Sequence, residues 1–540
     1  MYDLKNKILY ILENLMKTRS LSYSKAENEA SEFIYDYLSK IKYFQDNKEY
    51  LIRYKIENDV YNREIICAVV KGNSDNTLIL SGHFDVVGIE EFGDFKDNAF
   101  DINKIEDNLK TLDLSENNKK DLYSKEWIYG RGSCDMKGGL SASMAILEEY
   151  SKQENKDGNL IFLAVPEEET YSIGMRESAK LLSNLKNKYN LNYKLMIIPE
   201  PNDRESNKHT LHIGTVGKCM PTIMVQGVKA HIMSYYNGLN PLSILSGIFE
   251  ETEGSLKLVD SYKNEKTPPP LWSYFKDLKY EYDVSIPFRA AGYFTVLHFS
   301  RTPEEIINEV KKISVESFNK FLNKFIKDYK EYNNKELEED YKAEVYTLSE
   351  LIDKLKSRKD FESFYQNLKK EISIKIREEK ETYPNTTIFA MEKILDYANF
   401  QYPFVLISFS PPYYPAVHSD FICGKEKYGS KYFKVIEEEY KKLYNIDIIC
   451  NNYMTGISDA SYSAVNTKYD YKIFSENMIV WGNEYSIDFN SIEDINIPTI
   501  IFGPWGKDLH RVTERVNKKS LLEEFPNIIE SLMKDVFSNN

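Results

Sequence analysis

Residues 77–87 read TLILSGHFDVV, and this stretch decides the fold of the chain. Residues 77–80 form a short apolar run of the kind that makes a buried strand, and a Ser-Gly pair ends it abruptly. His83 and Asp85 follow two residues apart. Because ligands collect at the carboxyl ends of strands in open α/β sheets, the pair suggests a metal-binding imidazole whose other ring nitrogen is held by a carboxylate. An ordinary loop is the alternative.

The composition of the chain excludes several classes of protein. With 540 residues it exceeds the size of a single hydrophobic core, so two or three domains are expected. Hydrophobic residues make up 42% and aromatic residues 14%, which is enough for globular cores and argues against general disorder. The net charge of −14, without a basic stripe, argues against nucleic acid and anionic membranes as partners.

Cysteine usage and apolar patterning indicate the compartment. The cysteines are Cys67, Cys134, Cys219, Cys423 and Cys450. Their odd number and lack of paired spacing are typical of reduced thiols in a cytosolic protein. Residues 4–15 carry apolar side chains at helical spacing, interrupted by Lys7 and Glu13, which predicts an amphipathic helix and not a signal peptide. No run reaches the ~18 apolar residues of a membrane span, so a soluble, cytoplasmic protein is expected.

Three more apolar runs end in acidic or histidine residues, as the first does. They are residues 160–165, followed by Glu167, Glu168 and Glu169; residues 195–198, followed by Glu200; and residues 498–502, followed by a segment with His510. Adjacent acids repel one another, so a positive charge should compensate them. A solvated acidic turn is the alternative, and the wholly apolar strand before the three glutamates weakens it.

Asp135 lies in a glycine-rich stretch, WIYGRGSCDMKGG at 127–139, before a predicted helix from 140 to about 150. A phosphate-binding loop is the competing interpretation of such a turn. The Walker spacing is absent, however, and a buried acid at the centre would repel phosphate, so Asp135 fits a cation better. The resulting set is His83, Asp135, Glu169, Glu200 and His510. Two imidazoles and three carboxylates suit a pair of divalent ions with one carboxylate bridging.

These motifs resemble those of the co-catalytic zinc metallopeptidases of family twenty, clan MH. That family includes aminoacylases, acetylornithine deacetylase, succinyl-diaminopimelate desuccinylase and glutamate carboxypeptidase. The matching motifs are SGHFDVV, GRGSCDMKGG, PEEETYSIG, IPEP, GISDA at 456–460, and His510 with Glu514. Residues 286–306, 408–415, 456–462 and 503–516 further resemble the arginine-utilisation (Roc-type B) branch.

The resemblance implies an α/β architecture in which an inserted domain interrupts the catalytic one. Residues 1–208 and 419–540 would form a zinc-peptidase catalytic domain, with a central mixed sheet flanked by helices. Residues 209–418 would form an enlarged α+β lid domain, in which residues 303–380 are strongly helical. The size of the lid motivates the hypothesis that it replaces a partner subunit and that the chain is a monomer; a homodimer is the alternative. Residues 89–125 read as a solvated loop, or else as a flap over the site.

The resemblance also implies the ligands of two divalent ions. Asp135 would bridge the ions, Glu169 and His510 would complete one site, and His83 and Glu200 would complete the other. Zinc is the expected metal, with cobalt or manganese as alternatives, because availability and not the ligand set decides among them.

Other residues take catalytic and binding roles by the same resemblance. Asp85 would orient His83, and Glu168 would be the general base, while Glu167 stands where the family more often has aspartate. His231, in the lid motif VQGVKAHIMSYYNGLNPLSIL, would stabilise the oxyanion of the transition state. A strand-end histidine without catalytic role is the alternative for His231.

Substrate-binding residues are expected in the lid. Asn240 matches the lid asparagine of the family, and Arg301 or Arg289 could bind a substrate carboxylate with two hydrogen bonds. The expected function is hydrolysis of an amide bond in a small amino-acid derivative or short peptide, with arginine catabolism as the context that the branch suggests. The alternatives are an aminopeptidase acting on di- or tripeptides and a non-catalytic metal-binding regulator or scaffold.

Overall fold

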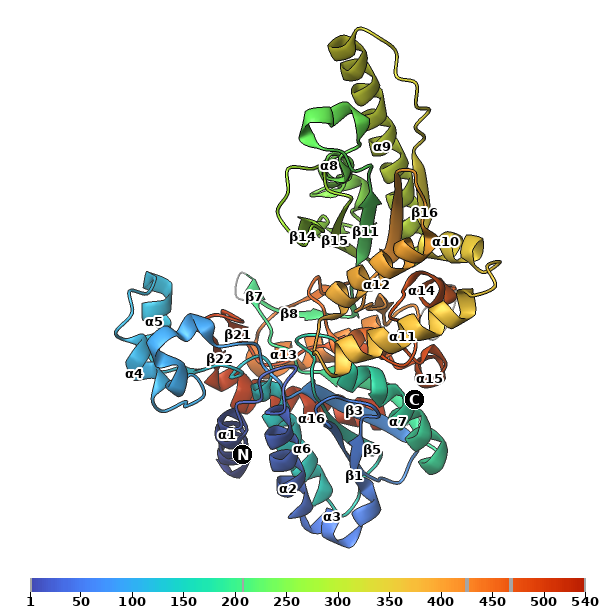
Figure 1. Ribbon diagram of the computed structural model, residues 1–540. Coiled ribbons are helices and arrows are strands. Elements are labelled where there is room, and N and C mark those ends of the chain that lie inside the picture. Colours follow the sequence, from blue (N-terminus) through green and yellow to red (C-terminus); the bar gives the residue numbers. More distant parts are fainter. Residues whose placement is uncertain (1, 206–207, 423–426, 466–469, 539–540) are drawn as a thin grey trace. The chain divides into compact units, whose positions relative to one another are not determined.

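In the computed structural model (Figure 1), a mixed nine-stranded sheet contains the opening stretch as an inner strand, β3 (Asn76–His83). β3 is buried along its whole length and pairs in parallel with β5 (Asn159–Val165) and with β6 (Asn192–Ile198). Strands that are covered on both faces consist almost entirely of apolar residues. Most residues of β3, β5 and β6 are apolar in the same way. The predicted α/β fold with a mixed central sheet is confirmed.

The sheet has the strand order β1-β2-β5-β3-β6-β20-β8-β19, and β7 pairs with β8. The bounds of the remaining strands are β1 (Leu51–Lys55), β2 (Glu64–Val70), β7 (Arg204–Glu205), β8 (Lys208–His212), β19 (Ile448–Asn451) and β20 (Thr499–Ile501). β1, β2 and β5 form antiparallel pairs, whereas β20 runs parallel to β6. The structure describes residues 2–205, 208–422, 427–465 and 470–538.

Helices cover both faces of this sheet. On one face, alternate strand residues such as Leu78 and Leu80 join a single apolar cluster to which Phe44 and five long helices also contribute. These are α1 (Tyr2–Lys17), α2 (Glu27–Ser39), α6 (Lys137–Ser151), α13 (Tyr428–Tyr444) and α16 (Phe525–Phe537). Outside that cluster, α7 (Ile173–Tyr189) contacts β2 and β5. Since successive strand residues point to opposite faces, a continuous apolar strand can fill both interfaces.

The chain divides into two compact units. Unit 1 consists of Met1–Thr215, Val417–Asn466 and Ile487–Asn540, and unit 2 of Val216–Ala416 and Thr467–Ser486. The nine-stranded sheet belongs to unit 1. Unlike the domains expected from the sequence, 1–208 with 419–540 and 209–418, these units group Thr467–Ser486 with the inserted part.

Unit 2 is built on a six-stranded sheet of order β10-β15-β11-β17-β16, with β14 also paired to β15. The strands are β10 (Gly217–Cys219), β11 (Pro221–Gln226), β14 (Leu271–Asp277), β15 (Arg289–His298), β16 (Glu344–Thr347) and β17 (Phe404–Phe409). The helices that contact this sheet include α8 (Pro241–Thr252), which contacts β11 and β15, and α12 (Tyr383–Ala398), which contacts β11.

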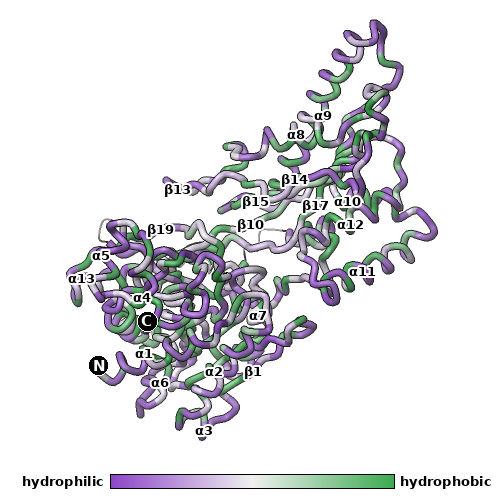
Figure 2. The backbone as a smooth tube through the Cα atoms, turned by 60° about the vertical axis from the view of Figure 1, so that its left-hand side comes forward, coloured by the Kyte–Doolittle hydropathy of each residue, from purple (hydrophilic) through white to green (hydrophobic). Residues whose placement is uncertain are grey.

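Residues 303–380 are largely helical, as expected. They form α9 (Pro303–Asn333), α10 (Leu348–Leu355) and α11 (Phe361–Arg377), with β16 between the first two. A capping box of Thr302 and Glu305 begins α9. Figure 2 shows hydrophilic and hydrophobic colours alternating along α9, the pattern of an amphipathic helix with one buried face.

The expectation of a solvated loop at residues 89–125 is wrong. This insertion contains η2 (Glu90–Asn98), α4 (Ile105–Leu109) and α5 (Glu116–Ser124). Its apolar residues form a cluster of their own, comprising Phe92, Ala99, Phe100, Ile105, Leu109 and Leu122 with Val86, Trp127 and Tyr129 from the flanking segments. The apolar residues are spread over three short elements, so no single window shows a helical period long enough to predict them.

The other sequence-based expectations concern cysteines and membrane spans. Cys67, Cys134, Cys219 and Cys450 are free thiols, and Cys423 lies outside the described residues. Among the described helices, none combines the length and apolar character needed to cross a bilayer.

Gly139 lets α6 approach the end of β6. A Cβ added at Gly139 would collide with the carbonyl oxygen of Pro199, which immediately precedes Glu200. We expect Gly139→Ala to destabilise the chain by about 1–3 kcal/mol through overpacking, measured as a lower midpoint of thermal unfolding. Gly247→Ala in α8 is the matched control, because its Cβ would lie 3.6 Å from the nearest atom of Ser317. Equal midpoints for the two variants would contradict this account of Gly139.

Candidate metal centre

Five segments of unit 1 carry the acidic and histidine residues. His83 ends β3, the three glutamates follow β5, and Glu200 follows β6. Because these strands are parallel, their carboxyl ends meet at the same edge. Asp135 lies in the turn before α6, and His510 lies between β21 (Gly506–Lys507) and β22 (Arg515–Asn517).

The five expected ligands lie together. His83 Nε2 is 3.3 Å from Asp135 Oδ1 and 3.7 Å from Glu200 Oε1. His510 Nε2 is 3.1 Å from Asp135 Oδ2 and 3.2 Å from Glu169 Oε2. The two oxygens of Asp135 therefore face two different imidazoles, with Glu200 beside one and Glu169 beside the other.

The donor set fits divalent metal ions. Ligand atoms of His83, Asp135 and Glu169 all lie within 4.8 Å of one another. His83 Nε2 is buried and makes no well-oriented hydrogen bond to any described residue, although Asp135 is close. Imidazole and carboxylate are ligands that zinc and related metals accept. A buried nitrogen that faces carboxylates without a bond is the arrangement expected of a ligand atom.

Electrostatics around the cluster also favour a cation. Burial, reinforced by neighbouring carboxylates, raises the pKa of Glu168 and Glu200 well above the usual range. Hydrogen bonds to Asp135 and Glu169 raise the pKa of His510 to about 10. A group of buried carboxylates that share so few cations is under mutual repulsion, which bound metal ions would relieve.

Asp85 aligns both the histidine and the glutamates. Its Oδ1 lies 3.4 Å from His83 Nδ1, and its backbone oxygen lies 3.1 Å from the same nitrogen. The two carboxylate oxygens also accept the backbone N–H groups of Glu168 and Glu169, at 3.0 and 3.2 Å. One fully buried carboxylate thus orients His83 and fixes the loop that carries two further site residues.

Asp459 is a site residue to which the sequence analysis assigned no role, although the GISDA motif contains it. Its side chain is 2% exposed, and neither carboxylate oxygen has a hydrogen-bond partner among the described residues. Burial raises its pKa to about 7, and its charge in turn contributes to the raised pKa values of Glu168 and Glu200. Its position in a short 3₁₀ turn gives no strand-end signal that would have identified it.

Glu514 and Glu167 stabilise the segments that carry the expected ligands. Glu514 Oε1 lies 3.4 Å from the backbone nitrogens of Cys134 and Asp135, and its other oxygen pairs with Arg131. Glu167 Oε2 lies 3.2 Å from Arg63 Nη2.

Arg63 is buried among three carboxylates. Its side chain is 1% exposed and pairs with Glu27 at 2.9 Å and Asp59 at 2.5 Å, as well as with Glu167. The longer side chain at 167, where the family more often has aspartate, thereby shares a cationic partner with Glu27 and Asp59.

The residue expected to stabilise the oxyanion, His231, and those expected to bind substrate, Asn240 and Arg301, belong to unit 2. His231 is exposed, and its Nδ1 accepts a hydrogen bond from the backbone of Met233 at 3.1 Å. Asn240 caps α8 through a 3.0 Å bond from the backbone N–H of Leu242. Arg301 is half-buried.

The guanidinium of Arg289, the alternative to Arg301, is already engaged. It lies 2.7 Å from Asp396 Oδ1 and 3.1 Å from Gln226 Oε1. This pairing favours a structural role for Arg289.

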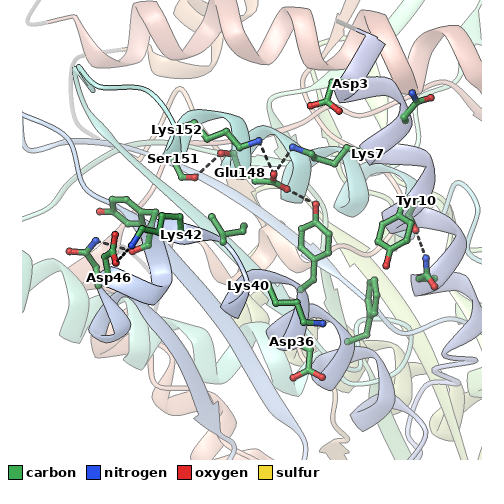
Figure 3. A pocket seen from close by; sticks show the side chains of 17 residues that line it. Asp3, Lys7, Tyr10, Asp36, Lys40, Lys42, Asp46, Glu148, Ser151 and Lys152 are labelled. Atoms are coloured by element: carbon green, nitrogen blue, oxygen red, sulfur yellow. Dashed lines mark hydrogen bonds and ion pairs between the residues drawn. The ribbon is translucent and has the colours of Figure 1, made fainter.

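A separate cavity of about 1170 Å³ lies among α1, α2, α3 (Lys42–Asp46) and α6 (Figure 3). Its lining shares no residue with the acid–histidine cluster. Lys7 and Lys152 both pair with Glu148, and Lys42 pairs with Asp46. Because these charges compensate one another, the cavity lacks the unpaired buried groups that mark the metal centre.

Comparison with known proteins finds one family along nearly the whole chain. The model of Peptidase family M20/M25/M40 matches residues 79–535. Protein RocB of Bacillus subtilis is 27% identical over 531 residues, which are 96% of this chain and 92% of that protein.

Solved structures with the same fold are peptidases. Aminopeptidase PepT from Bacillus cereus superposes with a TM-score of 0.53 and 11% identity, over 99% of both chains. The YXEP protein of Bacillus subtilis, a dinuclear metal-binding peptidase, superposes with a TM-score of 0.51 and 11% identity, over 99% of both chains. At these identities the likeness shows the fold alone.

The Arg63 cluster generates a stability prediction. Arg63→Met would leave three buried carboxylates without their cation, so we expect a loss of about 3–5 kcal/mol in the free energy of unfolding, measured by urea denaturation. Arg53→Met is the control. Arg53 also pairs with two glutamates, Glu32 and Glu64, but is one-third exposed, and about 1 kcal/mol or less is expected there. Similar losses for both variants would show that Arg63 does not compensate the buried charge.

Proposed function

The chain belongs to peptidase family M20/M25/M40 and is a hydrolase, and we propose that it cleaves an amide bond in a small amino-acid derivative or short peptide with the help of two divalent metal ions. The cluster of two imidazoles and three carboxylates, in which Asp135 faces both imidazoles, carries this proposal. The YXEP protein of Bacillus subtilis, which shares the fold, is a dinuclear metal-binding peptidase, and this supports the number of ions.

We assign the ligands from the distances between the imidazole nitrogens and the carboxylate oxygens. His83 and Glu200 would hold one ion, Glu169 and His510 the other, and Asp135 both. When bound, such a pair of ions lowers the pKa of water towards about 7 and polarises a carbonyl oxygen. Zinc is the expected metal, with cobalt or manganese as alternatives.

Glu168 would move the proton. Its carboxylate is buried close enough to His83 and Glu200 for their charges to shift its pKa, and its backbone is held by Asp85. As general base it would take a proton from the attacking water and pass it to the nitrogen of the leaving amine, while the C–N bond breaks and the water oxygen stays on the acyl carbon.

His231 is the residue we propose for oxyanion stabilisation. Because its Nδ1 accepts a hydrogen bond, its Nε2 carries the proton and can donate to a developing negative charge. Asn240 and Arg301 are proposed to bind substrate. The Asn240 side-chain oxygen is occupied by the helix cap, which leaves its NH₂ group as a donor.

The acyl and amine parts of the substrate are proposed from resemblance. Residues 286–306 resemble the arginine-utilisation branch, which makes N-acyl arginine derivatives the first substrates to test. An aminopeptidase acting on di- or tripeptides is the second candidate, and Asp459 favours it, because a buried carboxylate that forms no ion pair with any described residue could accept a substrate ammonium group. A regulator or scaffold without turnover would not need the buried Glu168, since a non-ligand acid there costs stability.

Glu168→Gln tests the proposed chemistry. We expect kcat to fall by roughly 10²–10⁴-fold while the metal content stays unchanged, because the amide cannot act as a base. Hydrolysis of N-acyl amino acids, including arginine derivatives, and of short peptides is measured with zinc or cobalt supplied. If neither the wild type nor the variant turns over any substrate while both bind two ions equally, the scaffold interpretation is correct.

His510→Ala tests the ligand set. We expect elemental analysis to give fewer than two ions per chain, because one site loses its imidazole. His231→Ala is the control, since it removes an exposed histidine that is not an assigned ligand, and it should leave the stoichiometry unchanged. Unchanged metal content in the His510 variant would remove His510 from the ligand set.

A further inference from the structure

The loop that carries His510, residues 508–514, differs from the segments that carry the other expected ligands. His83 ends a buried strand, with 1% of its side chain exposed, whereas the side chain of His510 is 49% exposed. His510 also has a φ of 61°, and Asp508 in the same loop has a φ of 56°, a region that residues other than glycine seldom adopt. An imidazole that is half exposed and carried on such a backbone depends on contacts from elsewhere to stay in place.

The helix α5 of the insertion supplies such a contact through Asp121. The carboxylate oxygen Oδ2 of Asp121 accepts hydrogen bonds from Arg515 Nη2 at 2.7 Å and Nε at 3.1 Å. Arg515 in turn donates from Nη1 to Asp508 Oδ2 at 2.5 Å. Asp508 also accepts from the hydroxyl of Thr513 at 2.7 Å. A chain of charge-assisted bonds thus runs from the insertion to both ends of the His510 loop.

Asn118 of α5 provides a parallel connection. Its side-chain oxygen accepts from Arg515 Nη2 at 3.1 Å, and its NH₂ group donates to the hydroxyl of Thr513 at 3.3 Å. Lys507, just before the loop, lies 2.8 Å from Asp121. The helix α5 therefore contacts the segment on both sides of His510.

Burial makes the loss of any of these contacts energetically costly. Arg515 is 2% exposed and Asp121 15% exposed, and the guanidinium of Arg515 lies 5.2 Å from the ring centre of Trp127. Removing one partner of such a buried pair leaves the other charge uncompensated, which is strongly unfavourable. Val512 of the loop also packs against the apolar cluster of the insertion. Figure 1 shows α4 and α5 beside β21 and β22, the strands that flank the loop.

A second contact links the insertion to the turn of Asp135. Glu91 of η2 pairs with Arg131, which pairs with Glu514. Glu514 Oε1 lies 3.4 Å from the backbone nitrogen of Asp135. Two of the expected ligands, His510 and Asp135, are thus supported by contacts that lead back to the insertion.

We propose that the insertion of residues 89–125 is a brace that sets the position of the His510 imidazole, with Asp121 as a positioning residue acting through Arg515 and Asp508. This inference rests on the proposed function, in which His510 binds a metal ion. It gives the insertion a role that is neither a solvated loop nor a flap over the site.

Asp121→Ala, Asp121→Glu and Asp107→Ala are compared in the full-length chain. Asp107 is the matched control, because it lies in α4 of the same insertion, is 80% exposed and pairs only with the neighbouring Lys110. Zinc binding to the metal-free chain is measured by titration calorimetry, and backbone hydrogen exchange of residues 508–514 is measured with and without zinc.

We expect Asp121→Ala to weaken the binding of one of the two zinc ions by about 10-fold, the lower end of the effect of residues that orient metal ligands. In Asp121→Ala, exchange of the amides in the His510 loop should become faster even without zinc. Asp121→Glu should partly restore both the zinc affinity and the exchange rate. Asp107→Ala should match the wild type in both measurements. A thermal midpoint close to that of the wild type excludes general unfolding. If Asp121→Ala does not fold, Asn118→Ala replaces it, because Asn118 is uncharged and only half-buried.

Failure of the brace and failure of the metal centre give different results. If the wild type binds two zinc ions and the Asp121 or Asn118 variant matches it in both affinity and exchange, the brace is refuted and the proposed function stands. If the wild type binds neither zinc nor, in repeat titrations, cobalt or manganese, the proposed function fails. Hydrogen exchange of the His510 loop then decides the brace by itself, and rates equal to the wild type refute it.

Discussion

The burial of several carboxylates at one edge of the central sheet is the constraint on which the rest of unit 1 depends. Asp135, Glu168, Glu169, Glu200 and Asp459 are all buried or nearly so at the carboxyl ends of parallel strands or in turns beside them. Parallel strands bring these ends together, and the apolar strands give the acids no access to water. Such a cluster must be compensated by hydrogen-bond donors, by cationic side chains or by bound cations. The protein itself supplies hydrogen-bond donors and cationic side chains.

The three consecutive glutamates show how the compensation is divided. Glu167 pairs with the buried Arg63, Glu168 keeps an unliganded carboxylate, and Glu169 faces His510. Their backbone is held by Asp85, which accepts the N–H groups of the last two. Three adjacent positions of one short loop thus hold a structural acid, a candidate base and a candidate ligand, because Glu167 and Glu169 face different cationic side chains.

The parts of the site that the sequence could predict are those where a short pattern and a strand end coincide. His83, Glu169 and Glu200 follow apolar strands directly, and Asp135 lies between glycines before a helix, so their proximity follows from the sheet. Arg63 could not be predicted in the same way. Its three partners are separated in the chain, and only the tertiary fold places them around one guanidinium. The helices of residues 89–125 were missed for a related reason, since their apolar residues form a cluster only with side chains from outside the segment.

The pairing of β4 (Trp127–Tyr129) with β22 has a consequence for how the chain reaches its final state. The two strands come from the first and the last segment of unit 1, and β20, which continues the central sheet, also comes late in the chain. Contacts between such distant segments form slowly, because a long loop must close first. On a ribosome, β22 and the histidine beside it emerge after nearly all other parts of unit 1. An unfinished chain therefore lacks His510 beside the other candidate ligands, and the complete candidate site forms only late in folding.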